Sequence, residues 1–514
     1  MKSRKLSTVY TTASIVTALS IAERGLGFLY RIVLSRLIGA EGLGLYQVAL
    51  SLFGLFLTIG TGGIPITVSR MISKSKAERR PTDERGAVSA GLCLCLALTL
   101  PACLFFGAFG KKLTFLFSDT RSIGVFQILL LGVCFSAIYA VIRGSFWGNK
   151  QFLLPSIIEI AEESVMAIVG VLLLQSVSSP AAGAERAAWA VVISYLFSFT
   201  TSLVCFFFCG GKLGKPKRQL KPLFNATMPI TLVRASGSLV GSAVAVLLPV
   251  MLVRTGMESG QALALFGIVS GMVLPVLFIP STVIGSLSLV LVPELSEDFY
   301  KKNYGRLRKN ILRGIRFSLL VACVLIPLFY AVGEDLGRWA FSNAQAGELI
   351  VQSCPLLLPM SLTMISTSVL NSMGYERQTL LFYFVGAAAL LLCVLLLPAL
   401  IGVSAYITGL FLSYLLTTFC NLIFLFKKCP FFEKTRGQVR VKELLLPLLL
   451  ILPISLFGKG VSLLLISVFG QFFALALSVV CTLAFTFFLY FLTGVLSRGK
   501  LRFPRKNRQK TSFF

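Results

Sequence analysis

Residues 123–147 read IGVFQILLLGVCFSAIYAVIRGSFW, and this stretch decides the class of fold. Its only charged residue is Arg143, and apolar and polar residues do not alternate along it. A run of about 20 apolar residues lets a helix cross a hydrocarbon layer about 30 Å thick. A strand of a membrane barrel would instead alternate apolar with polar side chains. The stretch therefore predicts a membrane-spanning α-helix.

Similar apolar runs occupy most of the chain. The 514 residues are 56% hydrophobic and 13% charged, which leaves too little polar surface for a water-soluble protein of this length. We expect an all-α membrane protein with about 14 spans, at residues 10–38, 43–70, 87–110, 123–147, 153–175, 187–210, 223–254, 261–292, 311–333, 347–372, 379–400, 402–426, 443–457 and 471–494. The thirteenth is short, which leaves open whether 461–469 lies at the membrane interface.

The basic residues between the spans predict the orientation of the chain. Of the 48 Lys and Arg residues, 35 fall in the two termini and in every second connection, and six fall in the other connections. Cytoplasmic loops carry the excess of Lys and Arg in membrane proteins. We therefore expect both termini in the cytoplasm. This distribution also explains the net charge of +28 without a nucleic-acid partner.

Short sequence echoes suggest that the chain consists of two related halves. Gly63-Ile-Pro-Ile-Thr-Val-Ser69 closes the second span and Leu291-Val-Pro-Glu-Leu-Ser296 closes the eighth. Many transporters are built from two such repeats around a midplane site. We expect a lobe of six helices at 1–222, a pseudo-symmetric second lobe of six at 223–428, and two further helices with a basic cytoplasmic tail at 429–514.

Seven arginines lie within the predicted spans: Arg24, Arg31, Arg36, Arg70, Arg143, Arg234 and Arg254. An arginine at the bilayer centre costs about 2.5–3.5 kcal/mol on insertion scales. Arg36, Arg70, Arg143 and Arg254 lie near predicted helix ends and are expected to reach the interface with their long side chains. Arg24 and Arg234 lie deeper, so they are the candidates for a water-filled cavity, with structural ion pairing as the alternative.

Glu159, Glu162 and Glu163 lie within the fifth predicted span. Positions three or four apart share a helix face, so these carboxylates must face protein or water. One interpretation is a proton or cation site that couples transport to an ion gradient or to the membrane potential. The other is that Glu163 simply pairs with an arginine such as Arg24.

Glycine and proline are expected to interrupt several spans. They occur at Gly62, Gly63 and Pro65, at Pro229, and at Pro275 and Pro280. Membrane helices tolerate such breaks where neighbours or cavity water satisfy the freed carbonyl groups. We interpret the six residues as hinges, with static kinks as the alternative.

The sequence argues against an enzyme, a metal site and a bound cofactor. It contains no histidine, and its 12 cysteines lie almost all within apolar runs without the spacing of zinc ligands. A membrane glycosyltransferase or ligase would need acidic or metal-binding groups in a sizeable outer loop, whereas the outer loops here are short and poor in carboxylates.

Several motifs together carry a resemblance to a known family. They are Arg24-Gly-Leu-Gly-Phe28 followed by Arg31, Ser35-Arg-Leu-Ile-Gly-Ala-Glu-Gly-Leu-Gly-Leu-Tyr46, Gly63 to Arg70, Ile142 to Gly148, Met228 to Arg234 and Leu291 to Ser296. In order and spacing the chain resembles the stage V sporulation protein B branch of the multidrug/oligosaccharidyl-lipid/polysaccharide exporter superfamily, over at least residues 10–430.

The resemblance implies a flippase of a bacterial cytoplasmic membrane. Its substrate would be an undecaprenyl-pyrophosphate-linked saccharide, such as the peptidoglycan precursor lipid II or another polysaccharide precursor. Arg24, Arg31 and Arg234 would bind the pyrophosphate, and Glu163 would be the family's acidic position in the fifth helix. Other partners would be membrane lipids and glycosyltransferases or polymerases of the same pathway, in sporulation, peptidoglycan or polysaccharide biosynthesis. The alternative within the superfamily is a cation-coupled multidrug antiporter, which the three glutamates favour.

Overall fold

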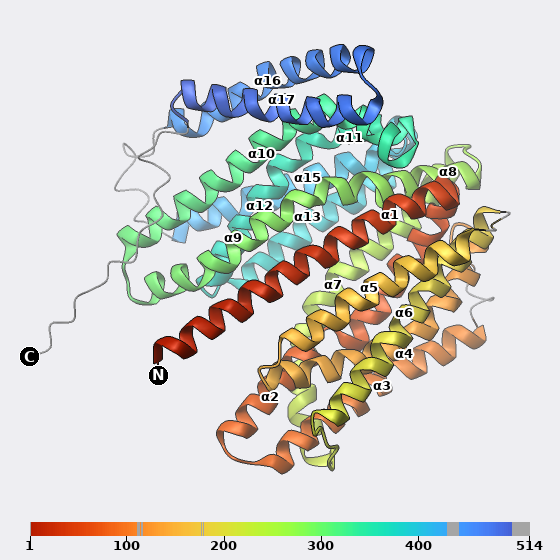
Figure 1. Cartoon of the computed structure of the whole chain (residues 1–514), viewed down its shortest axis with the longest axis vertical. Coiled ribbons are helices and arrows are strands. Elements are labelled where there is room, and N and C mark those ends of the chain that lie inside the picture. The colour runs from red at the N-terminus through yellow and green to blue at the C-terminus, as the bar shows by residue number, and fades with distance from the viewer. Residues whose placement is uncertain are drawn as a thin grey trace, which may run out of the picture. The chain divides into compact units, whose positions relative to one another are not determined.

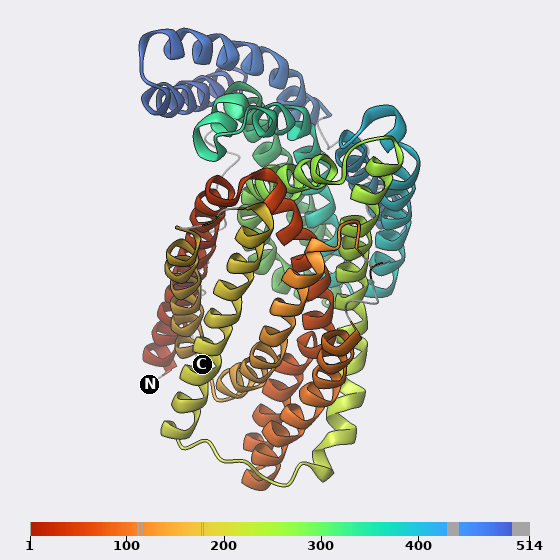
Figure 2. The same cartoon turned by 90° about the vertical axis from the view of Figure 1, so that its right-hand side faces the viewer.

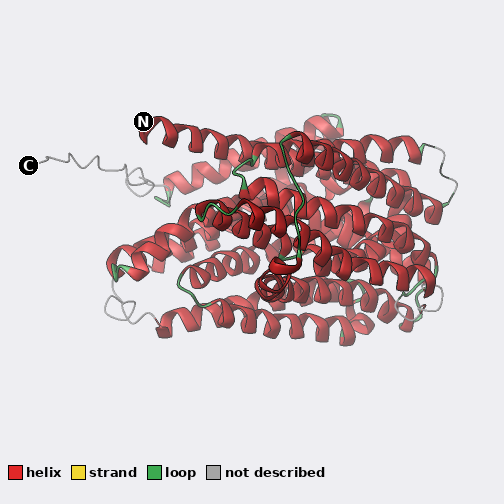
Figure 3. Cartoon of the chain, turned by 90° about the horizontal axis from the view of Figure 1, so that it is seen from below, coloured by secondary structure: helices red, strands yellow, loops and turns green. Residues whose placement is uncertain are grey.

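The computed structural model describes residues 2–109, 114, 117–175, 177, 179–428 and 441–495. Within these residues every regular element is a helix, as Figure 3 shows. The prediction of an all-α protein is therefore confirmed.

The helices follow one another with short connections (Figure 1). The first elements are α1 (Lys2–Thr61), α2 (Ile64–Ala77), α3 (Pro81–Phe109), α4 (Arg121–Gly148), α5 (Leu153–Leu174), α6 (Pro180–Phe208), α7 (Lys217–Arg254), α8 (Ser259–Gly267) and the π-helix η3 (Ile268–Val273). They are followed by α9 (Leu274–Tyr300), α10 (Tyr304–Phe341), α11 (Ala344–Ser353), the 3-10 turn η4 (Cys354–Leu356), α12 (Leu357–Ser372), α13 (Glu376–Leu396), α14 (Pro398–Ile401), α15 (Ser404–Lys428), α16 (Val441–Val468) and α17 (Gln471–Leu492).

The described residues contain 12 helical stretches that are long and apolar enough to cross a membrane. The expected number was about 14, and two features account for the difference. One stretch, Ile15–Ala77, joins the first two predicted spans. The helix α5 is absent from the 12 and corresponds to the fifth predicted span, which carries the three glutamates. Large apolar side chains such as Leu104 and Leu449 lie exposed on the helix surfaces, as expected of a multi-pass membrane protein.

The thirteenth predicted span is longer than expected. The helix α16 runs without interruption from Val441 to Val468, so 461–468 continues the helix and does not form a separate interfacial segment. Pro447 and Pro453 lie inside it. The prediction of a short span was wrong, because the helix continues through Gly458, Lys459 and Gly460, beyond the predicted end at residue 457.

The helices form two compact units. One contains the described residues up to Pro275 together with Leu390–Gly409, and the other contains Val276–Ala389 together with the described residues from Leu410 onward. Residues 223–275, which the sequence analysis assigns to the second lobe, thus pack with the first unit. The division of the chain into transport lobes at residue 222 stays a prediction.

In the first unit, α1 bends at Gly39, whose φ of 70° lies in the region that favours glycine. The segment after this bend packs closely on α8. A Cβ atom on Gly44 would meet the backbone carbonyl of Leu263, and one on Gly267 would meet Gly44 in turn. Small residues allow such close approach between membrane helices. The two glycines therefore fix how α1 lies on α8.

An apolar core joins the other helices of the first unit. Ile72 of α2, Val88 of α3, Phe146 of α4 and Phe206 of α6 are buried in it together with Leu223 of α7. In Figure 1, α3, α4 and α6 lie side by side. This core holds together the helix ends on the side that the sequence predicts to be cytoplasmic.

In the second unit, α10 is the central element. Its first half packs with α9, α12 and α15 through a buried cluster that includes Leu307 and Ile311. Its second half packs against the antiparallel pair α16 and α17, and Cys323 of α10 is buried in this contact. Lys459 of α16 pairs with Glu334 of α10 at 3.0 Å. The two last helices are thus attached to the unit by both apolar and ionic contacts.

Candidate substrate and ion site

Charged side chains of α1, α4 and α5 gather inside the first unit. Arg143 Nη1 of α4 donates to Glu159 Oε1 of α5 at 2.7 Å, and both side chains are half-buried. The guanidinium carbon of Arg143 also lies 5.0 Å from the ring centroid of Trp147 and 5.5 Å from that of Tyr139. That Arg143 reaches the interface stays a prediction, and the structure adds a carboxylate on the neighbouring helix that binds it.

The short connection between α4 and α5 explains this pair. Arg143 lies five residues before α4 ends at Gly148, and Glu159 lies six residues after α5 begins at Leu153. Antiparallel helices joined by a short loop bring such positions to similar depth. This spacing is therefore a signal in the sequence from which the pair can be predicted.

The three glutamates of α5 point toward three different helices. Glu159 binds Arg143 of α4, and Glu162 faces the Ser198 hydroxyl of α6. The carboxylate of Glu163 lies against Gly27 of α1, where a Cβ atom would collide with Glu163 Oε1. The structure thus distributes the carboxylates over the packing faces of α5.

Glu163 lies at a close contact between α1 and α5. A Cβ atom on Gly170 of α5 would collide with the Tyr30 side chain of α1, so two glycines, one on each helix, permit this contact. The charges of Glu23 and Arg31 on α1 both act on Glu163. Glu23 is also close enough to Glu159 and Arg143 to interact electrostatically. Glu23 and Arg143 therefore join the cluster, although the sequence analysis did not propose them.

The structure places the three predicted pyrophosphate-binding arginines on exposed positions. Arg24 and Arg31 lie on α1, and Arg234 lies on α7. Among the described residues none of the three forms a hydrogen bond or an ion pair, so the pair of Glu163 with Arg24 is not observed. Arg31 is near the carboxylates of α5, whereas no interaction connects Arg234 with Arg24 or Arg31.

Two further polar atoms near the cluster lack partners. Arg143 Nε and Tyr30 Oη are buried and make no hydrogen bond with the described residues. A buried donor without a partner costs about 1–3 kcal/mol, and water or a ligand group usually satisfies it. The cluster therefore retains capacity for a further polar group. Within the part of the chain that the structure describes, no set of three His, Cys, Asp or Glu residues is placed to hold a metal ion.

The predicted hinge residues have different surroundings. Gly62 and Gly63 separate α1 from α2, where Gly63 N donates to Thr231 Oγ1 of α7 at 3.1 Å. A Cβ atom on Gly63 would lie 2.6 Å from the Thr227 carbonyl oxygen, and Pro65 packs against Gly144 of α4. This break is thus tightly packed within the first unit.

The remaining proline sites do not interrupt their helices. α7 continues through Pro229, and α9 continues through Pro280. Pro275 is the second residue of α9, which directly follows the π-helical turn η3. Interruption of the helices at Pro229 and Pro280 was therefore a wrong prediction, and a hinge role for all six residues stays a prediction.

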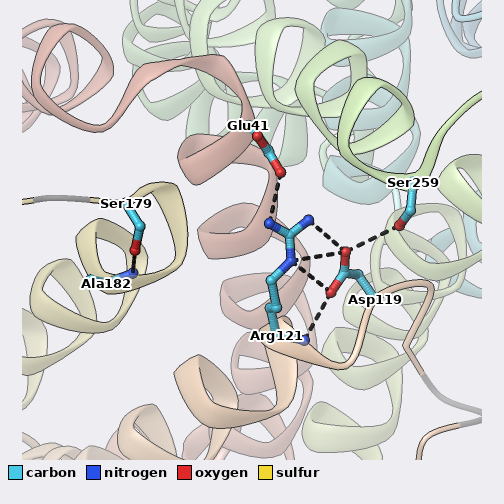
Figure 4. A network of polar contacts seen from close by, with 6 residues as sticks. All are labelled: Glu41, Asp119, Arg121, Ser179, Ala182 and Ser259. Atoms are coloured by element: carbon cyan, nitrogen blue, oxygen red, sulfur yellow. Dashed lines mark hydrogen bonds and ion pairs between the residues drawn. The ribbon is translucent and has the colours of Figure 1, made fainter.

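A second polar network lies at the other end of α4 (Figure 4). Arg121 pairs with Asp119 at 2.7 Å and with Glu41 of α1 at 2.8 Å, and Ser259 of α8 donates to Asp119 at 3.1 Å. Burial alone would raise the pKa of Asp119, but the hydrogen bonds from Arg121 and Ser259 hold this pKa below its usual value. The network ties three chain segments of the first unit together.

Comparison with known proteins assigns the family. The sequence profile described as "Polysaccharide biosynthesis protein" matches residues 10–299, which is more than half of the chain. The chain belongs to this family. The matched segment includes the charged cluster of α1, α4 and α5 as well as Arg234.

Two proteins from Bacillus subtilis (strain 168) are similar to the chain. Stage V sporulation protein B is 25% identical over 360 residues, which cover 67% of this chain and 69% of that protein. The lipid II flippase MurJ is 21% identical over 415 residues, which cover 72% and 74% of the two chains. Recognition of this superfamily from the sequence motifs is confirmed.

Solved structures share the fold. The inward closed conformation of the lipid II flippase MurJ superposes with a TM-score of 0.69 at 14% identity, over 94% of this chain and all of that one. An inward-facing multidrug resistance transporter of the MATE family gives a TM-score of 0.66 at 12% identity, over 80% and 96%. The fold class predicted from the sequence is thereby confirmed. The described activities of these proteins are transport and flipping, which agrees with the expectation that the chain is not an enzyme.

Proposed function

We propose that this membrane protein moves an undecaprenyl-pyrophosphate-linked saccharide from the inner to the outer leaflet of a bacterial cytoplasmic membrane. The family membership carries the proposal. Similarity to the lipid II flippase supports a lipid-linked saccharide as the substrate class, and lipid II is one candidate. Both termini would lie in the cytoplasm, where the enzymes of the pathway assemble the substrate.

Arg24, Arg31 and Arg234 are the residues that we assign to the pyrophosphate. They are exposed and form no ion pair among the described residues, so their donors are available to a ligand. The planar guanidinium group gives bidentate hydrogen bonds to phosphate and keeps its charge. A phosphate would offset the cost of placing these cations within membrane helices.

Alanine variants of these arginines test the assignment. In liposomes that contain the purified protein and an undecaprenyl-pyrophosphate-linked saccharide, Arg24→Ala and Arg234→Ala should each slow leaflet transfer about tenfold or more, because each removes charge-assisted hydrogen bonds. Arg254→Ala, at the end of α7, is the matched control and should transfer at the wild-type rate. Transfer at the wild-type rate by both Arg24→Ala and Arg234→Ala would show that these two arginines do not bind the pyrophosphate.

We further propose that the carboxylates of α5 couple transport to an ion gradient. The Glu163 carboxylate of α5 lies against α1. It interacts electrostatically with one negative group, Glu23, and one positive group, Arg31. Such a group changes its interactions when it binds a proton or sodium ion. Transport by Glu163→Gln should lose its dependence on pH or sodium, and a variant with the wild-type dependence would exclude this role.

A cation-coupled multidrug antiporter is the second candidate. It is favoured by the carboxylates at Glu23, Glu159, Glu162 and Glu163 and by the fold shared with a multidrug transporter. The three unpaired arginines argue against it, since they would repel an organic cation. Uptake of such a cation in exchange for protons would support the antiporter.

A further inference from the structure

The first unit contains a cavity of about 300 Å³ at the end of α4 that is remote from the Arg121 network. Its walls come from the end of α2 and the start of α3, the end of α4 with the connection to α5, and the end of α6 with the connection to α7. All three connections are among the segments that the sequence predicts to be cytoplasmic. None of the residues proposed for the transported substrate or the coupling ion lines this cavity.

The floor of the cavity is apolar. It consists of Val88, Phe146 and Phe206, which are exposed by only 2%, 2% and 5% of their surface and belong to the core of the unit. Because these side chains are fixed by the core, the floor is preformed. These side chains are almost fully buried and present little surface to a ligand, so the rim and not the floor would recognise one.

The rim of the cavity is cationic. It carries Lys76, Arg85 and Lys212 against a single carboxylate, Glu84. Glu84 lies 3.8 Å from Lys76, at the limit of an ion pair. Among the described residues the side chains of Arg85 and Lys212 form neither an ion pair nor a hydrogen bond. The rim thus has a net charge of about +2, which a phosphate group with one to two negative charges would balance.

The segments that carry the cations are held in place. Gly214 N donates to Ser89 Oγ of α3 at 3.0 Å, and a Cβ atom on Gly214 would lie 2.8 Å from the Cβ atom of Arg85. Figure 2 shows the connection from α6 to α7 running along this end of the unit. The contact between the backbone at Gly214 and α3 therefore holds Lys212 and Arg85 on the same rim, although both are cations.

We propose that this cavity binds a phosphate-bearing ligand at a site separate from the transport path. Unpaired cations on a rim that the backbone holds in place are the arrangement that a phosphate group requires. The phosphate would contact Arg85 and Lys212. The ligand is either the headgroup region of an anionic phospholipid or a soluble phosphate monoester.

Binding to the purified full-length protein tests the proposal in two arms. The soluble arm titrates 1-naphthyl phosphate, which combines a phosphate with an aromatic group, against protein in phosphatidylcholine nanodiscs. The lipid arm compares the thermal stability of the protein in nanodiscs of phosphatidylcholine with and without phosphatidic acid. Saturable binding in the first arm identifies a soluble ligand, and stabilisation only by phosphatidic acid identifies a lipid.

The double variant Arg85→Gln/Lys212→Gln should weaken the response about tenfold or more in the arm that responds, since two charge-assisted contacts are lost. The matched control is Arg218→Gln/Lys221→Gln, which removes one Arg and one Lys from exposed positions of α7 outside the cavity and should leave the response unchanged. Two results would overturn the proposal: no response in either arm, or an equal loss in both double variants.

Discussion

At the scale of single residues, the contact between Gly27 and Glu163 defines how the charged cluster is built. The glycine leaves the space that the carboxylate occupies, so the position of an ionisable group depends on the absence of a side chain on the facing helix. Gly25 lies two residues earlier on the same helix, and a Cβ atom there would meet nothing within 4 Å. Gly25 is therefore a matched control position for the contact at Gly27.

Gly27→Ala should lower the free energy of unfolding by only about 0.5–1.5 kcal/mol, because the new methyl group meets the end of the Glu163 side chain, which can rotate away into another rotamer. Gly25→Ala should leave it unchanged or raise it by about 0.5–1 kcal/mol, because alanine is the better helix former. Melting temperatures of the purified variants in detergent measure both effects. Glu163→Ala added to Gly27→Ala should restore most of the loss, and no restoration would mean that the two residues do not meet.

Removal of either partner of the Arg143–Glu159 pair should destabilise the protein more than removal of both. Arg143→Gln or Glu159→Gln alone leaves a half-buried charge without its partner and should cost about 1–3 kcal/mol. The double variant removes both charges and should cost less than the sum of the single changes. A thermal double-mutant cycle measures the coupling, and additive losses would show that the pair contributes nothing.

At the scale of helices, most of the architecture could be predicted from the sequence and most of the contacts could not. Apolar runs located the spans, because hydrophobic length alone determines what can cross a bilayer. The bend at Gly39 falls in the expected gap between the first two spans. Prolines were less informative, since α7 and α9 continue through Pro229 and Pro280.

The candidate site was predictable only in part, because the sequence locates the spans but not the contacts between them. The sequence marked Glu159, Glu162 and Glu163 as unusual within a span, but it could not show that each faces a different helix. Helix rotation depends on small residues such as Gly27, whose role appears only once the facing helix is known. The depth match between Arg143 and Glu159 is the exception, because a short connection fixes it.

The packing of α1 on α8 gives a prediction at this scale. Gly44→Ala should destabilise the protein by about 1–3 kcal/mol, since the added methyl group collides with the backbone of Leu263, which cannot rotate away. Gly54→Ala, on the same segment of α1, meets nothing within 4 Å and is the control. Equal melting temperatures for the two variants would contradict the close contact between these helices.

At the scale of the whole molecule, the distribution of charge predicts how the chain lies in the membrane. Basic residues concentrate in alternate connections, and the two compact units each contribute to this pattern. The family assignment covers residues 10–299, whereas the fold shared with the lipid II flippase extends over 94% of the chain. The common fold therefore extends well beyond the segment that the family profile matches.

Labelling of single cysteines tests the orientation. In a background without the native cysteines, Lys301→Cys should react with an impermeant maleimide only after the membrane is permeabilised, because residue 301 follows α9 in a basic segment. Lys111→Cys, in a connection predicted to be external, should react in intact cells. Labelling of residue 301 from outside would reverse the predicted topology.

The most direct test of the proposed function compares two substrates in the same liposomes. Purified protein is reconstituted with an undecaprenyl-pyrophosphate-linked saccharide, and the appearance of its headgroup in the opposite leaflet is followed beside uptake of the organic cation ethidium. We predict that the saccharide crosses faster than in protein-free liposomes while ethidium uptake stays at the protein-free rate. Saccharide transfer at the protein-free rate, together with proton-dependent movement of ethidium, would contradict the proposal.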